Sequence, residues 1–517
     1  MAGNKYIIRE KFMKKNSFWK IGLVIFGIMA MLMCGCGGDD NPSSGGNPSG
    51  EDPSGGNPSG GNPSDGEPSG GNPSGGDPSG GNPPDGDPPQ ITYNVIFNTN
   101  GGEPVPASQT IISGGKVTQP QTITKVRYIF DGWYKEESLI NQWNFSTDTV
   151  SSNVTLYAKW KQLEPLYVKQ ISSGGSHTVV IGTDGSLWAW GSNQYGDLGD
   201  GTTIGKNTPT KIGTDINWKS VSAGNNYTVA IKTDGSLWAW GLNNNGQLGD
   251  GQINNSKTNY GYLYKDTPTR IGAETNWESV SAGYNHTVAI KTDGSLWKWG
   301  SELTPTRVGA DNDWVSISAG NLYTQATKTD GSLWAWGSNQ LGKLGDGTTV
   351  LSRNAPTRIG TETNWKSVSA GSMHTMAIKT DGSLWGWGNM YYKPVDGTGT
   401  GVTIPTQIGT DNNWVFVFAG DNHTIAIKTD GSLWAWGKND FGQLGDGTTI
   451  EISTPTRIGT DINWKSVSGG DSGAGWFYTT AIKTDGSLWV WGDNRAEQLG
   501  DGTTTSRRTP TQILIYE

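Results

Sequence analysis

The sequence predicts an all-β protein whose larger part is a seven-bladed β-propeller. The phrase Asp-Gly-Ser-Leu-Trp-x-Trp-Gly occurs seven times, and a strand-like repeat of this kind indicates stacked supersecondary units. Each unit carries four short apolar segments separated by Gly, Asn, Asp and Thr, a pattern typical of four strands. Seven such units favour a closed ring, because closure removes exposed sheet edges. The seven phrases begin at Asp184, Asp234, Asp293, Asp330, Asp381, Asp430 and Asp485.

Composition narrows the class of protein further. The chain has 517 residues, of which 78 are Gly and 25 are Trp, and its formal net charge is −9. So much Trp supplies ample apolar surface for a packed core. Residues 91–517 contain no cluster of Lys and Arg, so we expect no nucleic-acid partner. Both cysteines, Cys34 and Cys36, precede this region, which therefore has no disulfide and no thiolate metal site.

The N-terminal segment predicts export and anchoring. Basic residues precede an apolar run over residues 21–33, which has the length of a signal-peptide core, and we assign residues 1–35 to a signal peptide. The run ends in Cys34-Gly35-Cys36, which resembles a bacterial lipoprotein cleavage box. The resemblance implies that Cys36 becomes the lipid-bearing first residue of the mature chain. An ordinary signal peptide or a short membrane anchor is the alternative.

Residues 36–90 form a linker of repeated Asn-Pro-Ser-Gly-Gly units, which cannot bury apolar surface and is expected to be disordered. The acidic pair Asp39-Asp40 resembles surface-export signals of some lipoproteins. We therefore predict a lipid-anchored protein of a bacterial cell envelope, exposed at the surface, with the N-terminal lipid as its one membrane contact.

A small domain is predicted over residues 91–162. Residues 93–97 alternate like a strand and run into the turn signal Asn100-Gly101-Gly102. The motifs Phe-Asp-Gly-Trp-Tyr, ending at Tyr134, and Leu-Tyr-Ala-Lys-Trp, ending at Trp160, follow. These signatures resemble the internalin B-repeat family, also called the Listeria–Bacteroides repeat. The resemblance implies a small β-grasp-like module without catalytic activity, whose aromatic residues form one core.

The propeller is assigned to residues 165–517. We name the strands of a unit A (Ser-Val-Ser-Ala), B (Thr-Val-Ala-Ile), C (Leu-Trp-Ala-Trp) and D (Pro-Thr-x-Ile). Asp-Gly between B and C predicts a tight hairpin turn, because Gly readily adopts a positive φ. The first unit starts at Leu166 without a D strand before it, and the last ends in an extra one at Pro510. We therefore expect the C-terminal strand to close the first blade, giving a monomeric ring.

These repeats resemble the regulator of chromosome condensation repeat family, through Ser-x-Gly-x-x-His-Thr, Asp-Gly-x-Leu-Trp-x-Trp-Gly and Gly-x-x-Gly-Gln-Leu-Gly. The resemblance implies a seven-bladed propeller that binds proteins through its faces. It does not bring the GTPase exchange activity of eukaryotic members, because a lipid-anchored envelope protein has no access to such a GTPase.

Repeated polar residues predict structure rather than chemistry. The four histidines occupy one repeat position, where Tyr replaces His in the other units, and equivalent positions are spread around the ring instead of converging on a metal. The seven Asp-Gly-Ser aspartates lack the asymmetry that paired catalytic carboxylates need. The Gly-Asp-Gly-Thr-Thr loops lack the dense oxygen-ligand spacing of a calcium loop. We predict no catalytic residue, no metal site and no cofactor. The histidines are His177, His286, His374 and His423.

Differences between the units point to a binding face. Unit two has an insertion after its C strand, unit three lacks that loop, unit five replaces it, and unit seven has a longer A–B turn. In an antiparallel blade the A–B turns and C–D loops lie on one face. Aromatic residues on loops above a rigid ring suit a contact with a protein or a glycan; neutral drift of surface loops is the alternative. The aromatic residues are Tyr260, Tyr262, Tyr264, Tyr391, Tyr392, Trp476 and Phe477.

The sequence thus predicts a non-catalytic binding module for a protein or a surface glycan. The alternatives are a glycan-active envelope enzyme that uses the propeller channel, and a purely structural surface spacer.

Overall fold

The computed structural model describes residues 89–252, 257–259, 261–348, 350–389, 401–470 and 477–516. These residues divide into a small compact unit that ends at Leu163 and a larger one that begins at Glu164. Within the described ranges, none of the helices has the length and apolar character needed to cross a membrane. Cys36, the predicted signal peptide and most of the predicted linker lie outside the described residues.

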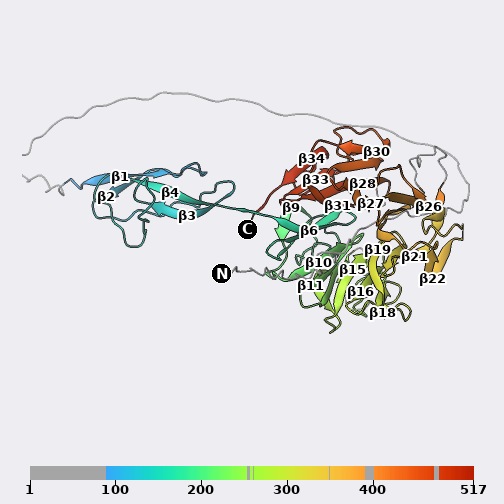
Figure 1. Ribbon diagram of the computed structural model, residues 1–517. Coiled ribbons are helices and arrows are strands. Elements are labelled where there is room, and N and C mark those ends of the chain that lie inside the picture. Colours follow the sequence, from blue (N-terminus) through green and yellow to red (C-terminus); the bar gives the residue numbers. More distant parts are fainter. Residues whose placement is uncertain are drawn as a thin grey trace, which may run out of the picture. The chain divides into compact units, whose positions relative to one another are not determined.

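The small unit is a mixed sheet with the strand order β2-β1-β4-β3 (Figure 1). Strand β1 runs parallel to β4 and antiparallel to β2, as expected for a β-grasp-like module. Its core contains Phe97 and Trp133, whose rings meet edge to face with centroids 5.0 Å apart. Its strands are β1 (Thr92–Asn98), β2 (Gln109–Ile112), β3 (Tyr128–Tyr134) and β4 (Val154–Gln162).

The larger unit contains seven blades, each an antiparallel sheet whose strands A, B, C and D follow one another in chain order, and one two-stranded sheet (Figure 1). The all-β propeller prediction is confirmed. Blade 1 contains β6 (Val168–Ser173), β7 (His177–Gly182), β8 (Leu187–Gly191) and β9 (Lys206–Lys211). Blade 2 contains β10 (Trp218–Ala223), β11 (Tyr227–Lys232), β12 (Leu237–Leu242) and β14 (Tyr262–Ile271), with β13 (Lys257–Asn259) at the edge. Blade 3 contains β15 (Trp277–Ala282), β16 (Thr287–Lys291), β17 (Leu296–Trp299) and β18 (Thr306–Arg307).

Blades 4 to 7 repeat this order. Blade 4 contains β19 (Trp314–Ala319), β20 (Tyr323–Lys328), β21 (Leu333–Ser338), the 3-10 turn η1 (Gln340–Gly342) and β22 (Ser352–Ile359), and blade 5 contains β23 (Trp365–Ala370), β24 (His374–Lys379), β25 (Leu384–Gly388) and β26 (Val402–Gln407). Blade 6 contains β27 (Trp414–Ala419), β28 (His423–Lys428), β29 (Leu433–Gly437) and β30 (Ile452–Ile458). Blade 7 contains β31 (Trp464–Gly470), β32 (Tyr478–Lys483), β33 (Leu488–Gly492) and β34 (Arg507–Ile513).

The expected closure of the first blade by the C-terminal D strand is wrong. Strand β34 pairs with β33 of its own repeat, and blade 1 has its own D strand, β9. Each D strand therefore pairs with the C strand that precedes it, across a short connection that costs little chain entropy. The ends of the unit are joined instead by a two-residue ladder between β5 (Pro165–Leu166) and β35 (Ile515–Tyr516).

Blade 7 nevertheless packs directly on blade 1, so the ring is closed. The hydroxyl of Tyr478 donates to the backbone carbonyl of His177 at 2.6 Å. The indole N–H of Trp190 donates to the carbonyl of Gln498 at 3.0 Å. Both bonds repeat contacts found between consecutive blades, so the closing junction is built like the others.

Strand A lies at the inside of the ring, where each A strand contacts the A strand of the next blade. At six of the seven junctions a serine hydroxyl on one A strand accepts a hydrogen bond from a backbone N–H of the next, as Ser222 does from Ala282 at 2.8 Å. In blade 6, Phe418 replaces this serine and is fully buried. Blade 7 accommodates the ring with Gly469, where a Cβ would lie 2.5 Å from it.

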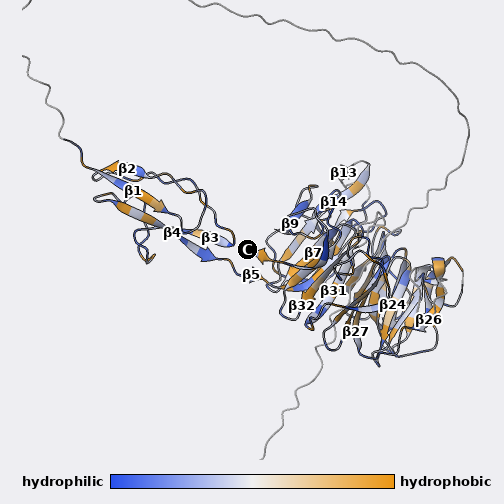
Figure 2. Cartoon of the chain, turned by 90° about the horizontal axis from the view of Figure 1, so that it is seen from above, coloured by the Kyte–Doolittle hydropathy of each residue, from blue (hydrophilic) through white to orange (hydrophobic). Residues whose placement is uncertain are grey.

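The core of the propeller lies between the blades, where the second Trp of strand C is buried in a cluster with residues of its own blade and of the preceding blade. Figure 2 shows hydrophobic residues along the strands of the blades. An edge-to-face pair such as Trp277 and Trp299, with centroids 6.0 Å apart, fixes the packing. The Trp-x-Trp pairs therefore act as scaffold.

The B–C turns and D–A links share one face of the ring. In each turn the Asp-Gly-Ser carboxylate accepts hydrogen bonds from the serine two residues on, as Asp234 does from the N–H of Ser236 at 2.9 Å. In blades 2 to 7 the last lysine of strand B lies over Trp rings and pairs with an acid of the D–A link. Lys232, for example, is 2.6 Å from Asp215. The turn role predicted for these aspartates is confirmed.

Candidate functional site

The opposite face, which carries the A–B turns and C–D loops, is called here the variable face. At five of the seven junctions, a loop after strand C covers the groove beside the next blade. Its sequence is Gly-x-Leu-Gly in blades 1, 2, 4 and 6, and Glu497-Gln498-Leu499-Gly500 in blade 7. Its leucine is fully buried, and the glycine after the leucine lies against the indole of that blade. The residue before the leucine is Asp197, Gln247, Lys343, Gln443 or Gln498.

One backbone carbonyl of this loop holds two side chains of the next blade. Between blades 2 and 3, the Gln247 carbonyl accepts from the indole N–H of Trp299 at 2.8 Å and from the hydroxyl of Thr287 at 2.8 Å. The N–H of Gly251 then donates to the carbonyl of Leu303 on the next blade at 2.9 Å. The same contacts recur at the other four junctions, so the loop is a standard part of the interblade seal.

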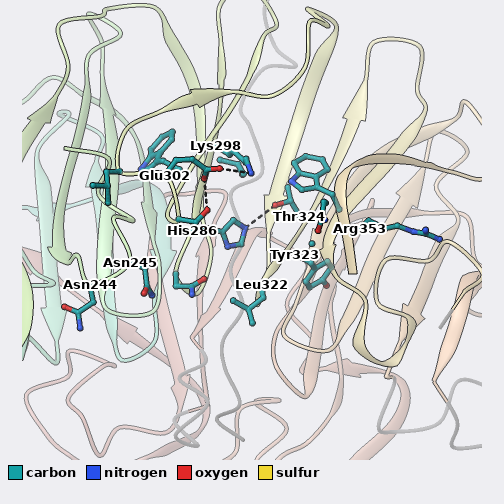
Figure 3. A pocket seen from close by; sticks show the side chains of 17 residues that line it. Asn244, Asn245, His286, Lys298, Glu302, Leu322, Tyr323, Thr324 and Arg353 are labelled. Carbon is teal, nitrogen blue, oxygen red and sulfur yellow. Dashed lines mark hydrogen bonds and ion pairs between the residues drawn. The ribbon is translucent and has the colours of Figure 1, made fainter. Parts of the chain in front are cut away.

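Blade 3 lacks this loop, and a cavity of about 640 Å³ lies beside its junction with blade 4 (Figure 3). Val288 and Trp336 contribute apolar side chains to its lining, while Leu303 and Leu322, which are 37% and 48% exposed, stand at its edge. The chain deletion therefore produces a hollow instead of a collapse of one blade onto the next.

The charged groups of this cavity are paired. Lys298 occupies a position of strand C where the other blades have Ala, Gly or Val, and its ammonium lies 3.1 Å from Glu302. Arg353 lies 2.7 Å from Asp346. His286 contacts the Thr324 hydroxyl through Nε2 at 3.1 Å (Figure 3), and burial, aided by the nearby Lys298 charge, lowers its pKa to about 4. The cavity therefore presents neutral hydrogen-bonding groups and paired charges at neutral pH.

A second feature of the variable face is a cluster of three tyrosines from three blades. Tyr195 comes from the C–D loop of blade 1, Tyr262 from β14 and Tyr284 from the A–B turn of blade 3. The rings of Tyr195 and Tyr262 lie 5.3 Å apart, and Tyr262 is 41% exposed. Burial, with Tyr262 nearby, raises the pKa of Tyr195 and of Tyr284. The three residues together are called the tyrosine cluster.

Asp197 lies close to the tyrosine cluster and is 1% exposed. Among the described residues, neither of its carboxyl oxygens has a hydrogen-bond partner, and burial raises its pKa well above the usual value. At the equivalent position of other blades, the Oε1 of glutamine accepts a hydrogen bond from a backbone N–H, as that of Gln247 does from Asn245 at 2.9 Å. Asp197 is one methylene shorter and makes no such bond at normal hydrogen-bonding distance, although the N–H of Tyr195, the equivalent donor, still acts to lower its pKa.

Two further titratable groups are buried on this face. The ammonium of Lys343 donates to the carbonyl of Asn321 at 2.8 Å, and burial lowers its pKa to about 8. Burial raises the pKa of Asp421 to about 7, although the nearby Lys438 and Lys343 charges favour its ionised form. These groups vary between the repeats, in contrast to the uniform lysines of the opposite face.

The structure brings together only part of the predicted aromatic site. Tyr262 is exposed and belongs to the tyrosine cluster. Tyr264 and Phe477 are only 8% and 7% exposed, which differs from the exposure expected for them. Tyr264 pairs with Leu242 on one side and β13 on the other, and Phe477 packs against Phe441 with ring centroids 6.1 Å apart. Outside the described residues lie Tyr260, Tyr391, Tyr392 and Trp476.

Sequence reasoning missed Tyr195, Tyr284 and Lys298. Tyr284 stands in an A–B turn position where the other units have Gly, Asn, Ser or Asp, and Lys298 interrupts a row of small residues. A column-by-column comparison of the seven units carries this signal for single residues, whereas the length differences drew attention to the loops.

Most of the repeated polar residues have structural partners, and only His423 among the histidines has no hydrogen-bond partner for its ring nitrogens within the described residues. His177, His286 and His374 each contact a threonine of the next blade through Nε2, as His177 does with Thr228 at 3.0 Å. The Gly-Asp-Gly-Thr-Thr aspartates accept from their own loop, as Asp200 does from the N–H of Thr202 at 2.9 Å. Among the described residues, no three His, Cys, Asp or Glu side chains are grouped to hold a metal ion.

Comparisons with known proteins cover both units. The sequence profile of the Listeria–Bacteroides repeat domain matches residues 93–159. A Gly-rich membrane protein of Evansella cellulosilytica is 39% identical over 92 residues, which are 18% of this chain and 10% of that protein. The ultraviolet-B receptor UVR8 of Arabidopsis thaliana is 27% identical over 232 residues, 44% of this chain and 42% of the receptor. The chain thus spans less than half the length of these curated relatives.

Among solved structures, Prp20p of Saccharomyces cerevisiae matches with a TM-score of 0.55 and 20% identity, over 67% of this chain and 87% of Prp20p. That structure is described together with the binding of Prp20p to Gsp1p and histones. At this identity the match shows the fold.

Two sequence profiles of the regulator of chromosome condensation (RCC1) repeat match the larger unit. One matches residues 184–231, 234–290, 330–378, 430–474 and 485–515, and the other matches residues 168–197, 218–247, 365–393 and 414–443. Their union covers more than half of the chain. The chain therefore belongs to the regulator of chromosome condensation repeat family, with a Listeria–Bacteroides repeat domain before the propeller.

Proposed function

We propose that this protein is a lipid-anchored, surface-exposed component of a bacterial cell envelope, and that its propeller binds a partner protein through the variable face without catalysis. The observation that carries this proposal is the coincidence of all major irregularities on one face of an otherwise uniform ring. Prp20p, which shares the fold, binds proteins. The uniform lysine–tryptophan face serves as scaffold.

The variable face has the composition of a recognition surface. It combines a cavity lined by both apolar and polar side chains with a partly exposed aromatic cluster, and aromatic residues in partly enclosed positions supply much of the energy of protein contacts. The ring beneath it is rigid, because every junction is hydrogen-bonded and packed, so little ordering entropy opposes association.

A surface glycan is the second candidate partner, favoured by the tyrosine cluster. Tyrosine rings can stack on the apolar faces of sugars while their hydroxyls take part in hydrogen bonds. Crosslinking of the protein on intact cells separates the two candidates. Treating the cells with proteinase beforehand removes a protein partner and leaves a glycan.

The variant Tyr195→Ser/Tyr262→Ser/Tyr284→Ser is expected to reduce capture of the partner at least tenfold, because it removes three aromatic contacts from the proposed interface. The measurement is crosslinking of the full-length protein on intact cells, followed by quantification of the crosslinked species. The matched control is Ile216→Ser/Ile462→Ser, which changes two exposed residues of the opposite face. Equal capture by the tyrosine variant and the parent, with the fold intact, would contradict a contact at this cluster.

The predicted anchor is tested separately. The variant Cys36→Ser is expected to move the protein from the membrane fraction to the soluble fraction and to abolish labelling by a fatty-acid analogue, because the lipid acceptor is gone. Cys34→Ser should keep both properties. Unchanged labelling of Cys36→Ser would favour the ordinary signal peptide or membrane anchor instead.

A further inference from the structure

We infer that the cavity between blades 3 and 4 is a docking site for a protruding Gly-x-Leu-Gly loop of the partner protein. The partner would supply, from outside, the loop that blade 3 lacks. This inference rests on the proposed function and names the chemistry that the variable face recognises.

Hydrogen-bonding groups of the cavity lack the partner that their equivalents have at the sealed junctions. At the five sealed junctions the second Trp of strand C is at most 1% exposed and donates its indole N–H to the loop carbonyl. Trp336, its equivalent in the cavity, is 6% exposed, and its N–H has no acceptor among the described residues. The group is therefore in place for a carbonyl that the chain itself does not provide.

The neighbouring threonine, Thr324, also lacks the contact with a loop carbonyl that its equivalents make. Thr228, between blades 1 and 2, contacts both the Asp197 carbonyl and His177 Nε2, each at 3.0 Å. Thr324 has only the second kind of contact in the described structure, to His286 at 3.1 Å. Asn354 occupies the position whose carbonyl accepts the N–H of the loop's last glycine at the sealed junctions, as that of Asp266 does from Gly201 at 2.8 Å. Thus two donors and one acceptor converge on the cavity.

The shape and charge of the cavity select the occupant. Lys298 and Arg353, the cationic residues of its lining, are both paired with acids, so an uncharged segment fits better than an acidic one. Its volume of about 640 Å³ is sufficient for a short peptide loop. In the sealed junctions only glycine fits beside the indole; at Gly249 a Cβ would lie 2.8 Å from Trp299. The occupant should therefore carry a glycine directly after its buried leucine.

The test uses a cyclic peptide with the sequence of residues 244–251, the loop of blade 2, titrated into the full folded protein labelled with nitrogen-15. We expect the indole N–H signal of Trp336 to shift on binding, and a peptide with Asp in place of leucine to bind at least tenfold more weakly. Trp336→Phe should weaken binding about tenfold, the equivalent of one lost hydrogen bond of about 1.4 kcal/mol. Trp387→Phe, whose indole is held by its own loop, is the matched control and should not change the affinity.

A variant with a grafted loop provides a second test. Replacing residues 301–303 by the blade 2 loop should fill the cavity and abolish peptide binding, while Trp336→Phe decides the question should the graft not fold. An unmoved Trp336 signal at saturating peptide, or equal affinity for the leucine and aspartate peptides, overturns the inference. The proposed function fails separately, when partner capture on cells survives the change of both the tyrosine cluster and the cavity.

Discussion

Replacing His177 by Tyr is expected to preserve about 2–3 kcal/mol of stability at pH 4.5 that the parent protein loses on acidification. His177 is fully enclosed between blades 1 and 2, and burial lowers its pKa to about 3. Tyr occupies this position in blade 2, where Tyr227 donates to the next blade's backbone at 2.6 Å. Gly174 leaves space for the ring, as Gly224 does for Tyr227.

The direction follows from proton uptake. Because the folded pKa of His177 lies below the unfolded value near 6.5, the unfolded chain binds more protons between the two values. The contribution of His177 is therefore fully present above about pH 6.5 and is lost as the pH falls toward 3. Urea unfolding followed by tryptophan fluorescence at pH 7.5 and pH 4.5 measures the effect. The same loss of stability in parent and variant would show that His177 does not titrate on unfolding.

Asp197→Gln is expected to stabilise the folded protein by about 1–3 kcal/mol at pH 8, because it removes a buried carboxylate whose ionised form is opposed by burial and favoured only by the N–H of Tyr195. Gln at this position can accept from the backbone N–H two residues before it, as Gln247 does. The pKa of Asp197 is raised by burial, so its favourable contribution exists below the unfolded pKa and is lost as the pH rises. The gain of the variant should therefore grow with pH and vanish near pH 4.

The melting temperature at pH 8 and pH 4 measures this gain. Asp200→Asn is the matched control, three residues away. Asp200 pairs with Lys206 at 3.2 Å, and its pKa is lowered by hydrogen bonds from Thr202 and by Lys206 despite the opposing effect of burial, so its removal should destabilise the protein at pH 8. A pH-independent change in Asp197→Gln would indicate altered packing instead of relief of a buried charge. Loss of partner capture in the same variant would add a binding role for the carboxylate.

Repetition made much of the fold predictable. Strand order, the two faces, and the turn role of aspartates such as Asp234 follow from local pattern, because each repeat forms its own sheet. The way in which the two ends of the ring are joined could not be predicted from the local pattern. The pairing of β35 with β5 joins residues about 350 positions apart and leaves no local signature in the sequence. Whether a strand closes its own blade or another depends on three-dimensional registration, which the count of Pro-Thr-x-Ile segments cannot decide.

The candidate site was predictable as a face and not as a set of residues. Tyr262 and Tyr264 lie on the same side of β14, yet only Tyr264 is covered by two neighbouring strands. Phe477 is covered by Phe441 from another blade. Burial of a loop aromatic depends on contacts between distant segments, whereas a missing loop is visible in the sequence and its cavity appears where the loop was.

The shared construction of the sealed junctions has a consequence for diversity. Each uses one loop carbonyl, one indole and one threonine, so trimming the loop of any blade would open a socket of the same chemistry at a different angle around the ring. Related chains could thus point one kind of socket in different directions by shortening different loops. In such a scaffold the repeat that carries the shortened loop determines where the binding pocket lies on the ring, while the fold and the chemistry of the pocket remain constant.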